Sequence, residues 1–141
     1  MSISFFNADI NYVLRDKTAL KIWLNTAAKK EGFSIEDLNI ILCSDEFLYR
    51  MNVAYLRHKT YTDIITFDNS VAHGAIVGEL YISIDRVRDN SKILQTHLRD
   101  ELHRVIVHGL LHLMGYSDKT DSLKRKMSLK EDQYLKIRKF L

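Results

Sequence analysis

The feature that most constrains this chain is a run of apolar residues between positions 105 and 114. At helical spacing the run covers almost the whole circumference of a helix, with Val105, Ile106, Val107, Leu110, Leu111, Leu113 and Met114. A helix that is apolar all round is normally buried in a protein core. The uncharged run 105–117 is too short to span a bilayer and contains two histidines. Two polar rings on such a helix need compensating partners.

Length and composition indicate a single domain formed by residues 1–141. A chain of this length removes roughly two-thirds of its unfolded surface from water on folding. Apolar residues make up 46% and charged residues 28% of the chain, which is near the average for globular proteins. No basic leader followed by an apolar stretch opens the sequence, and Cys43 is its one cysteine. We therefore expect a cytoplasmic protein without an internal disulfide.

Residue spacing predicts an α+β fold. Alternating or β-branched runs predict strands at residues 1–6, 38–43, 62–67 and 76–84. Helical spacing and capping residues predict helices at 17–30, 44–55, 85–90, 96–114 and 121–139. The expected architecture is a small mixed four-stranded sheet packed by about four to five helices.

A metal site is predicted at the end of the long helix. His108 and His112 are four residues apart, so both imidazoles lie on one helix face and can reach one ion. Gly115 can adopt the left-handed conformation that ends the helix and returns the chain, which brings Asp118 within reach as a third ligand. Zinc, or another divalent transition metal, is the expected ion, with one position left open for water. If Asp118 is not the third ligand, the alternatives are Asp121 or a position filled by water.

This histidine pair has two other interpretations. Both rings could be core residues bonded to carbonyl groups, although an apolar helix with two polar rings favours a metal. A metallopeptidase helix would carry a glutamate as general base directly after the first histidine, and this chain has Gly109 there. The pair therefore indicates metal ligands without the peptidase base.

The segment 108–118 resembles a family signature. It reads HGLLHLMGYSD, and the signature HGxLHLxGYDH belongs to the YbeY endoribonuclease, or ribosomal RNA maturation factor, family. Residues 43–46 resemble the family's CSDE segment, Asn52 with Thr62 and Asp63 resembles its N…TD spacing, and Gly78 with Glu79 resembles its G[DE]I strand. The resemblance covers roughly residues 36–118.

The resemblance implies a metal-dependent, single-strand-directed endoribonuclease. Its expected role is 3′-end maturation of small-subunit ribosomal RNA, together with ribosome quality control. Two positions depart from the family pattern. Asp118 stands where the family has its third metal histidine, and Leu56 stands at the position of a family arginine, with Arg57 following it.

Cationic residues outside the motif are candidates for RNA contact. The net charge is only +3, but residues 119–141 contain eight Lys or Arg against three Asp or Glu. Lys124, Arg125 and Lys126 belong to this basic segment and are predicted to contact RNA, as is Lys59. Arg57 is the predicted catalytic cation, which would balance charge that develops on the phosphorus centre.

Three functions are compatible with these features. The first is an RNA hydrolase whose partners are ribosomal RNA and the small ribosomal subunit, with no membrane or DNA partner expected. The second is a ribosome-associated RNA-binding protein that uses its metal structurally and has little or no nuclease activity, which the Leu56 position would suit. The third is a metallopeptidase, which Gly109 disfavours.

Overall fold

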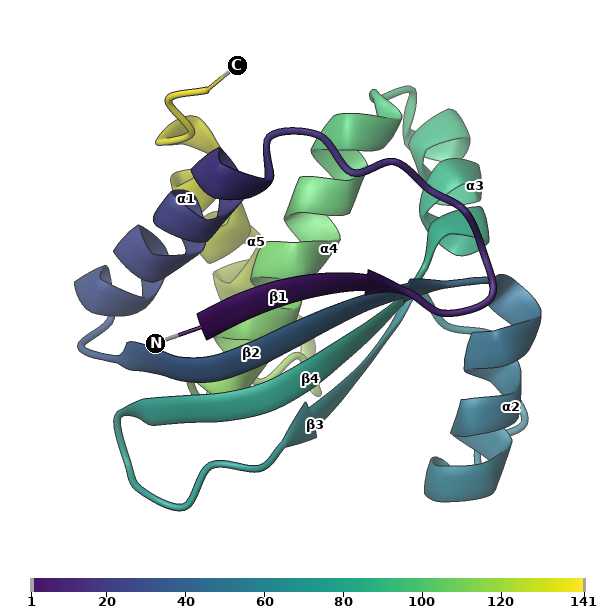
Figure 1. Ribbon diagram of the computed structural model, residues 1–141, viewed down its shortest axis with the longest axis horizontal. Helices are drawn as coiled ribbons and strands as arrows, with labels where there is room; N and C mark the ends of the chain where they lie inside the picture. The colour runs from purple at the N-terminus through teal and green to yellow at the C-terminus, as the bar shows by residue number, and fades with distance from the viewer. Residues whose placement is uncertain (1, 141) are drawn as a thin grey trace.

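A four-stranded mixed sheet forms one layer of the computed structural model, which describes residues 2–140 (Figure 1). Its strands are β1 (Ser2–Asn7), β2 (Ser34–Cys43), β3 (Ile64–Asp68) and β4 (Ala75–Ser83), in the spatial order β1-β2-β4-β3. The pairs β1·β2 and β2·β4 are parallel, whereas β3 is antiparallel to β4. The predicted start of the first strand, Met1, lies outside the described residues.

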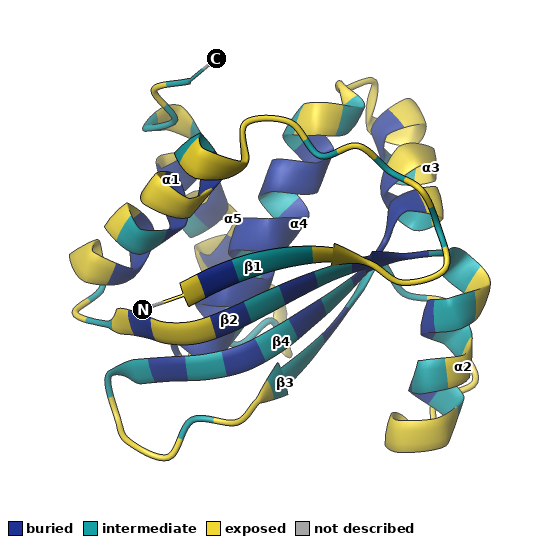
Figure 2. Ribbon diagram, viewed as in Figure 1, coloured by how far each residue is buried: buried dark blue, intermediate teal, exposed yellow. Residues whose placement is uncertain are grey.

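Within residues 2–140, five helices accompany the sheet, so the predicted α+β class is confirmed. They are α1 (Lys17–Lys30), α2 (Asp45–Leu56), α3 (Ile84–Leu94), α4 (Leu98–Leu113) and α5 (Asp121–Lys136). Helix α4 contacts β3 and β4 and is itself flanked by α1, α3 and α5. Almost all of α4 beyond its first turn is dark blue in Figure 2, as the apolar run predicted.

Strand alternation divides the core between the two faces of the sheet. Leu38, Ile40 and Leu42 of β2 face the main core, which also contains the buried side chains of α1 and α4. Cys43 and Ile65 belong to a smaller cluster with Leu48 of α2 on the opposite face. Alternate side chains of the sheet therefore pack against different helices, α1 and α4 on one face and α2 on the other.

Three element boundaries differ from the predicted ones by three residues or more. Strand β2 begins at Ser34 rather than at residue 38, because β4 pairs with it from that point and holds its polar residues in the sheet. Helix α3 continues to Leu94, and Ile84, Val87 and Ser91 are its buried residues. Helix α5 ends at Lys136, after which Arg138 bonds back to Asp100 of α4.

Two glycines let α4 and β3 approach β4 closely. A Cβ atom on Gly109 would lie 2.7 Å from Ile64 Cδ1 and 2.8 Å from Leu80 Cδ2. A Cβ atom on Gly78 would lie 2.8 Å from the Phe67 carbonyl oxygen and 3.0 Å from Leu113 Cδ1. The obstacle at Gly78 is backbone, which cannot rotate away as a side chain can. The absence of side chains at Gly78 and Gly109 therefore allows the C-terminal half of α4 to lie close to β3 and β4.

We predict that Gly78→Ala lowers the free energy of unfolding by about 1–3 kcal/mol, because the added methyl group forces β3 and α4 away from β4. Chemical denaturation monitored by far-UV circular dichroism measures the change. An unfolding free energy equal to that of the unsubstituted protein would contradict the close-packing argument.

Candidate metal centre

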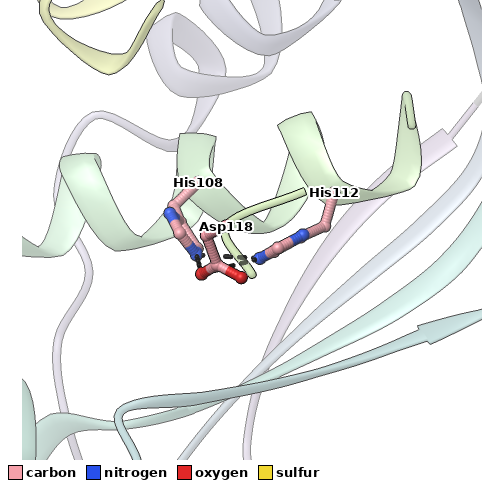
Figure 3. A group of neighbouring side chains, drawn as sticks. All are labelled: His108, His112 and Asp118. Atoms are coloured by element: carbon pink, nitrogen blue, oxygen red, sulfur yellow. Dashed lines mark hydrogen bonds and ion pairs between the residues drawn. The ribbon is translucent and has the colours of Figure 1, made fainter. Parts of the chain in front are cut away.

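Helix α4 presents His108 and His112 from successive turns toward Asp118 in the loop that follows (Figure 3). The two Nε2 atoms lie 2.9 Å apart, and the ring planes are nearly perpendicular at 85°. Asp118 Oδ2 lies 3.4 Å from His108 Nε2 and 3.5 Å from His112 Nε2. The structure thus brings together the three residues that the sequence predicted, whereas Asp121 is not in the cluster.

The turn at Gly115 explains how Asp118 reaches the histidines. Gly115 has φ 97°, and its N–H donates to the His112 carbonyl at 3.0 Å. The Tyr116 N–H donates to the Leu111 carbonyl at 3.1 Å. This bond pair is the Schellman motif, in which a left-handed residue ends a helix and reverses the chain. The predicted role of Gly115 is confirmed.

Hydrogen bonds to the outer ring nitrogens orient both imidazoles. His112 Nδ1 lies 2.9 Å from the Tyr116 carbonyl oxygen, and His108 Nδ1 lies 2.6 Å from Glu131 Oε2. A carbonyl oxygen and a carboxylate only accept, so in each neutral imidazole Nδ1 carries the proton and Nε2 keeps a lone pair. Two lone pairs and the Asp118 carboxylate therefore converge on one point. Three converging acceptors are the donor set of a divalent cation.

Charges around the histidines favour a cation at this point. Burial alone lowers the pKa of His108, but the hydrogen bond and charge of Glu131, helped by Asp118 and Asp63, outweigh burial and raise it. Burial raises the pKa of the Asp63 carboxyl, against the stabilising effects of His108 and of the backbone N–H groups of Asp63 and Ile64. The charge of Asp63 is thus one of the influences that raise the pKa of His108.

Glu131 is a candidate site residue that spacing within the motif did not predict. Its side chain is only 8% exposed, and Arg104 Nη1 donates to its Oε1 at 2.7 Å. Arg104 also reaches Asp132 Oδ1. Helical spacing does contain a signal, because Glu131 occupies the same buried face of α5 as Met127 and Tyr134. A carboxylate on an apolar helix face requires a buried partner.

A second, partly buried carboxylate stabilises the turn that carries Asp118. The Tyr116 hydroxyl donates to Glu31 Oε1 at 2.6 Å, and Lys130 Nζ lies 3.1 Å from Glu31 Oε2. The Tyr134 hydroxyl also donates to Glu31. Tyr116 is thus a packing residue whose carbonyl oxygen orients His112.

A hollow of about 760 Å³ opens beside the cluster, at the outer edge of β3. Its lining includes all three candidate ligands, together with Leu56, Asp63, Thr66, Asp68 and Lys119. The side chains of His108, His112 and Asp118 are 22%, 27% and 42% exposed. The cluster is therefore accessible from the hollow, which leaves room for water and a substrate group.

The other predicted site residues do not line this hollow. Arg57 is exposed at the C-terminal cap of α2 with φ 57°, and Leu56 rather than Arg57 lines the hollow. Lys59 is exposed in the segment between α2 and β3. The residues of α5 predicted to bind RNA, Lys124, Arg125 and Lys126, are exposed, and Lys126 Nζ lies 5.7 Å from the centre of the Tyr116 ring.

The position of Gly109 gives a structural reason against peptidase chemistry. The residue packs against Ile64 and Leu80, so a glutamate there would collide with the sheet. The structure therefore has no space for a peptidase general base directly after His108.

The chain combines an α+β fold with a buried helix that presents two histidines to a carboxylate in the following loop. These features define a class of proteins with a candidate metal site of two histidines and one carboxylate. The family model described as Endoribonuclease YbeY matches residues 5–139. A Cytophaga hutchinsonii protein with that name is 55% identical over 139 residues, which cover 99% of this chain and 97% of the relative. The chain belongs to the YbeY family.

A second relative and a solved structure also match this chain over most of its length. A protein named Endoribonuclease YbeY from Amoebophilus asiaticus is 40% identical over 134 residues, covering 95% of this chain and 91% of the relative. The solution structure of a Thermotoga maritima protein matches with a TM-score of 0.66 and 25% identity, over 96% of this chain and 87% of that one.

We predict that Glu131→Gln weakens zinc binding about 10- to 100-fold, because a neutral amide orients His108 less firmly and removes a negative charge from its ring. Competition with a chromophoric chelator measures the affinity. Asp132→Asn is the matched control, since Asp132 also pairs with Arg104 but has no contact with His108. Equal affinities in the two variants would contradict the orienting role of Glu131.

Proposed function

We propose that this protein is a zinc-dependent endoribonuclease that cleaves single-stranded segments of small-subunit ribosomal RNA. Its proposed role is in 3′-end maturation and in ribosome quality control, with the small ribosomal subunit as partner. The supporting observation is the convergence of three acceptor atoms at an accessible hollow, in a chain of a family described as Endoribonuclease YbeY. This observation favours hydrolysis over a purely structural metal, because a structural zinc site is normally closed by four protein ligands.

The proposed reaction assigns separate roles to metal ligands, to the groups that orient them and to a cation near the phosphate. His108, His112 and Asp118 would hold the ion, while Glu131 and the Tyr116 carbonyl fix the two rings. When bound there, zinc supplies a Lewis acid for a phosphodiester oxygen and lowers the pKa of water at its free position. Arg57 is the cation proposed from the sequence to balance charge that develops on the phosphate.

The proposed location is the cytoplasm, where ribosomal RNA is processed, and DNA and membranes are not among the proposed partners. Within residues 2–140, no helix has the length and apolar character needed to cross a membrane.

Substitutions of Asp118 test the proposed function. A carboxylate ligand lowers the net charge of the centre by one unit compared with a neutral histidine, so the ion is a weaker Lewis acid. We predict that Asp118→His tightens zinc binding and lowers the pH at which cleavage begins, whereas Asp118→Ala loses the metal. Elemental analysis and cleavage of a single-stranded RNA across a pH series measure both effects.

The unsubstituted protein, with and without a chelator, provides the control for this series. Cleavage should disappear with the chelator and return with zinc. Full metal content in Asp118→Ala would remove Asp118 from the ligand set. Metal without any cleavage in the unsubstituted protein would identify a binding protein instead of a nuclease.

We also predict that reversing Lys124, Arg125 and Lys126 to glutamate weakens RNA binding at low salt. For a single strand, removing one cation from a phosphate lowers the logarithmic slope of affinity against salt concentration by about 0.7. Fluorescence anisotropy with a labelled ribosomal RNA fragment, repeated at several salt concentrations, measures both the affinity and the slope. An unchanged affinity would exclude this face of α5 from the RNA surface.

A further inference from the structure

The lining of the hollow is unbalanced in charge. Asp63, Asp68 and Asp118 contribute carboxyl groups, and within the described part of the chain Lys119 is the one Lys or Arg that lines it. A phosphodiester brings one more negative charge into this space. Only the ion at the histidine cluster and Lys119 would oppose the resulting repulsion.

The backbone of Lys119 is held at a defined place beside the cluster. It directly follows Asp118, and its N–H donates to Ser117 Oγ at 3.3 Å. The next residue, Thr120, caps α5 by accepting from the Leu123 N–H at 3.1 Å. Lys119 is therefore fixed between a candidate ligand and a helix start, at the rim of the hollow.

The ammonium group of Lys119 is available to a ligand. Its side chain is exposed, and no ion pair to it occurs among residues 2–140. The nearby cations differ in this respect: Arg104 is paired with Glu131 and Asp132, and Lys130 is paired with Glu31. Arg57 is exposed as well, but it does not line the hollow.

We propose that Lys119 binds a non-bridging oxygen of the RNA phosphodiester in the hollow and so positions that phosphate beside His108, His112 and Asp118. The proposal rests on the proposed nuclease function and names its substrate-binding residue. A lysine suits this role because its ammonium is a compact charge on a flexible stem and donates to phosphate oxygens.

The test compares Lys119→Gln and Lys119→Arg with Lys21→Gln in the zinc-loaded protein. Lys21 is an exposed lysine of α1, which packs against β2 rather than against β3, so its substitution removes the same charge far from the hollow. The probe is a short fluorescent single-stranded RNA without secondary structure. Affinity is measured by anisotropy at several salt concentrations, and zinc content, kcat and KM are measured in parallel.

We expect Lys119→Gln to weaken binding roughly five- to tenfold and to reduce the salt slope by about 0.7, the value for one phosphate contact on a single strand. The KM for cleavage rises correspondingly and zinc content stays constant. Lys119→Arg retains most of the affinity, and Lys21→Gln changes neither affinity nor slope. Arg57→Gln, measured alongside, has a smaller effect on binding than Lys119→Gln.

The possible outcomes separate this proposal from the proposed function. RNA binding that depends on Lys119 without cleavage in any variant would support the phosphate contact and reject the nuclease. Normal cleavage and binding in Lys119→Gln would overturn the role of Lys119 and leave the nuclease intact. Loss of zinc in Lys119→Gln, or a larger effect of Arg57→Gln, would also overturn it.

Discussion

The hydrogen bonds to the outer nitrogens of His108 and His112 allow a buried helix to carry two polar rings. Helix α4 packs so closely on the sheet that Gly109 has no room for a side chain. Imidazoles on such a helix are costly unless each polar atom has a partner. The Tyr116 carbonyl and Glu131 satisfy the Nδ1 atoms, which leaves both Nε2 lone pairs for a cation. The same contacts that permit burial therefore create the donor set.

Local sequence was sufficient for the candidate ligands because they are close together in the chain. Helix geometry determines how His108 and His112 lie relative to each other, and the left-handed residue Gly115 determines the direction of the turn toward Asp118. The strands were also predictable, because alternation in β4 and the apolar positions of β2 reflect burial on one face. These features depend on neighbouring residues rather than on the packing of distant elements.

Contacts between distant elements were not predictable in this way. Glu131 is 23 residues beyond His108, and its partner depends on how α5 lies on α4. Glu31 lies 85 residues before Tyr116, and the two side chains meet because α1 flanks α4. The polar start of β2 was missed for a related reason, since pairing with β4 keeps those residues in the strand. Among these contacts, only that of Glu131 was indicated by the sequence, because a carboxylate on an apolar helix face needs a buried partner.

Helix α5 consequently contributes to the candidate metal centre as well as to the basic segment 119–141. Its buried face carries Glu131, which orients His108, and Tyr134, which bonds Glu31 and through it supports the Tyr116 turn. Its exposed face carries the cations Lys124 and Arg125. A metal ion binds a preformed donor set more tightly than one that it must order. Metal binding and the packing of α5 against α4 are therefore expected to favour each other. The C-terminal helix and the ion are thus expected to stabilise each other.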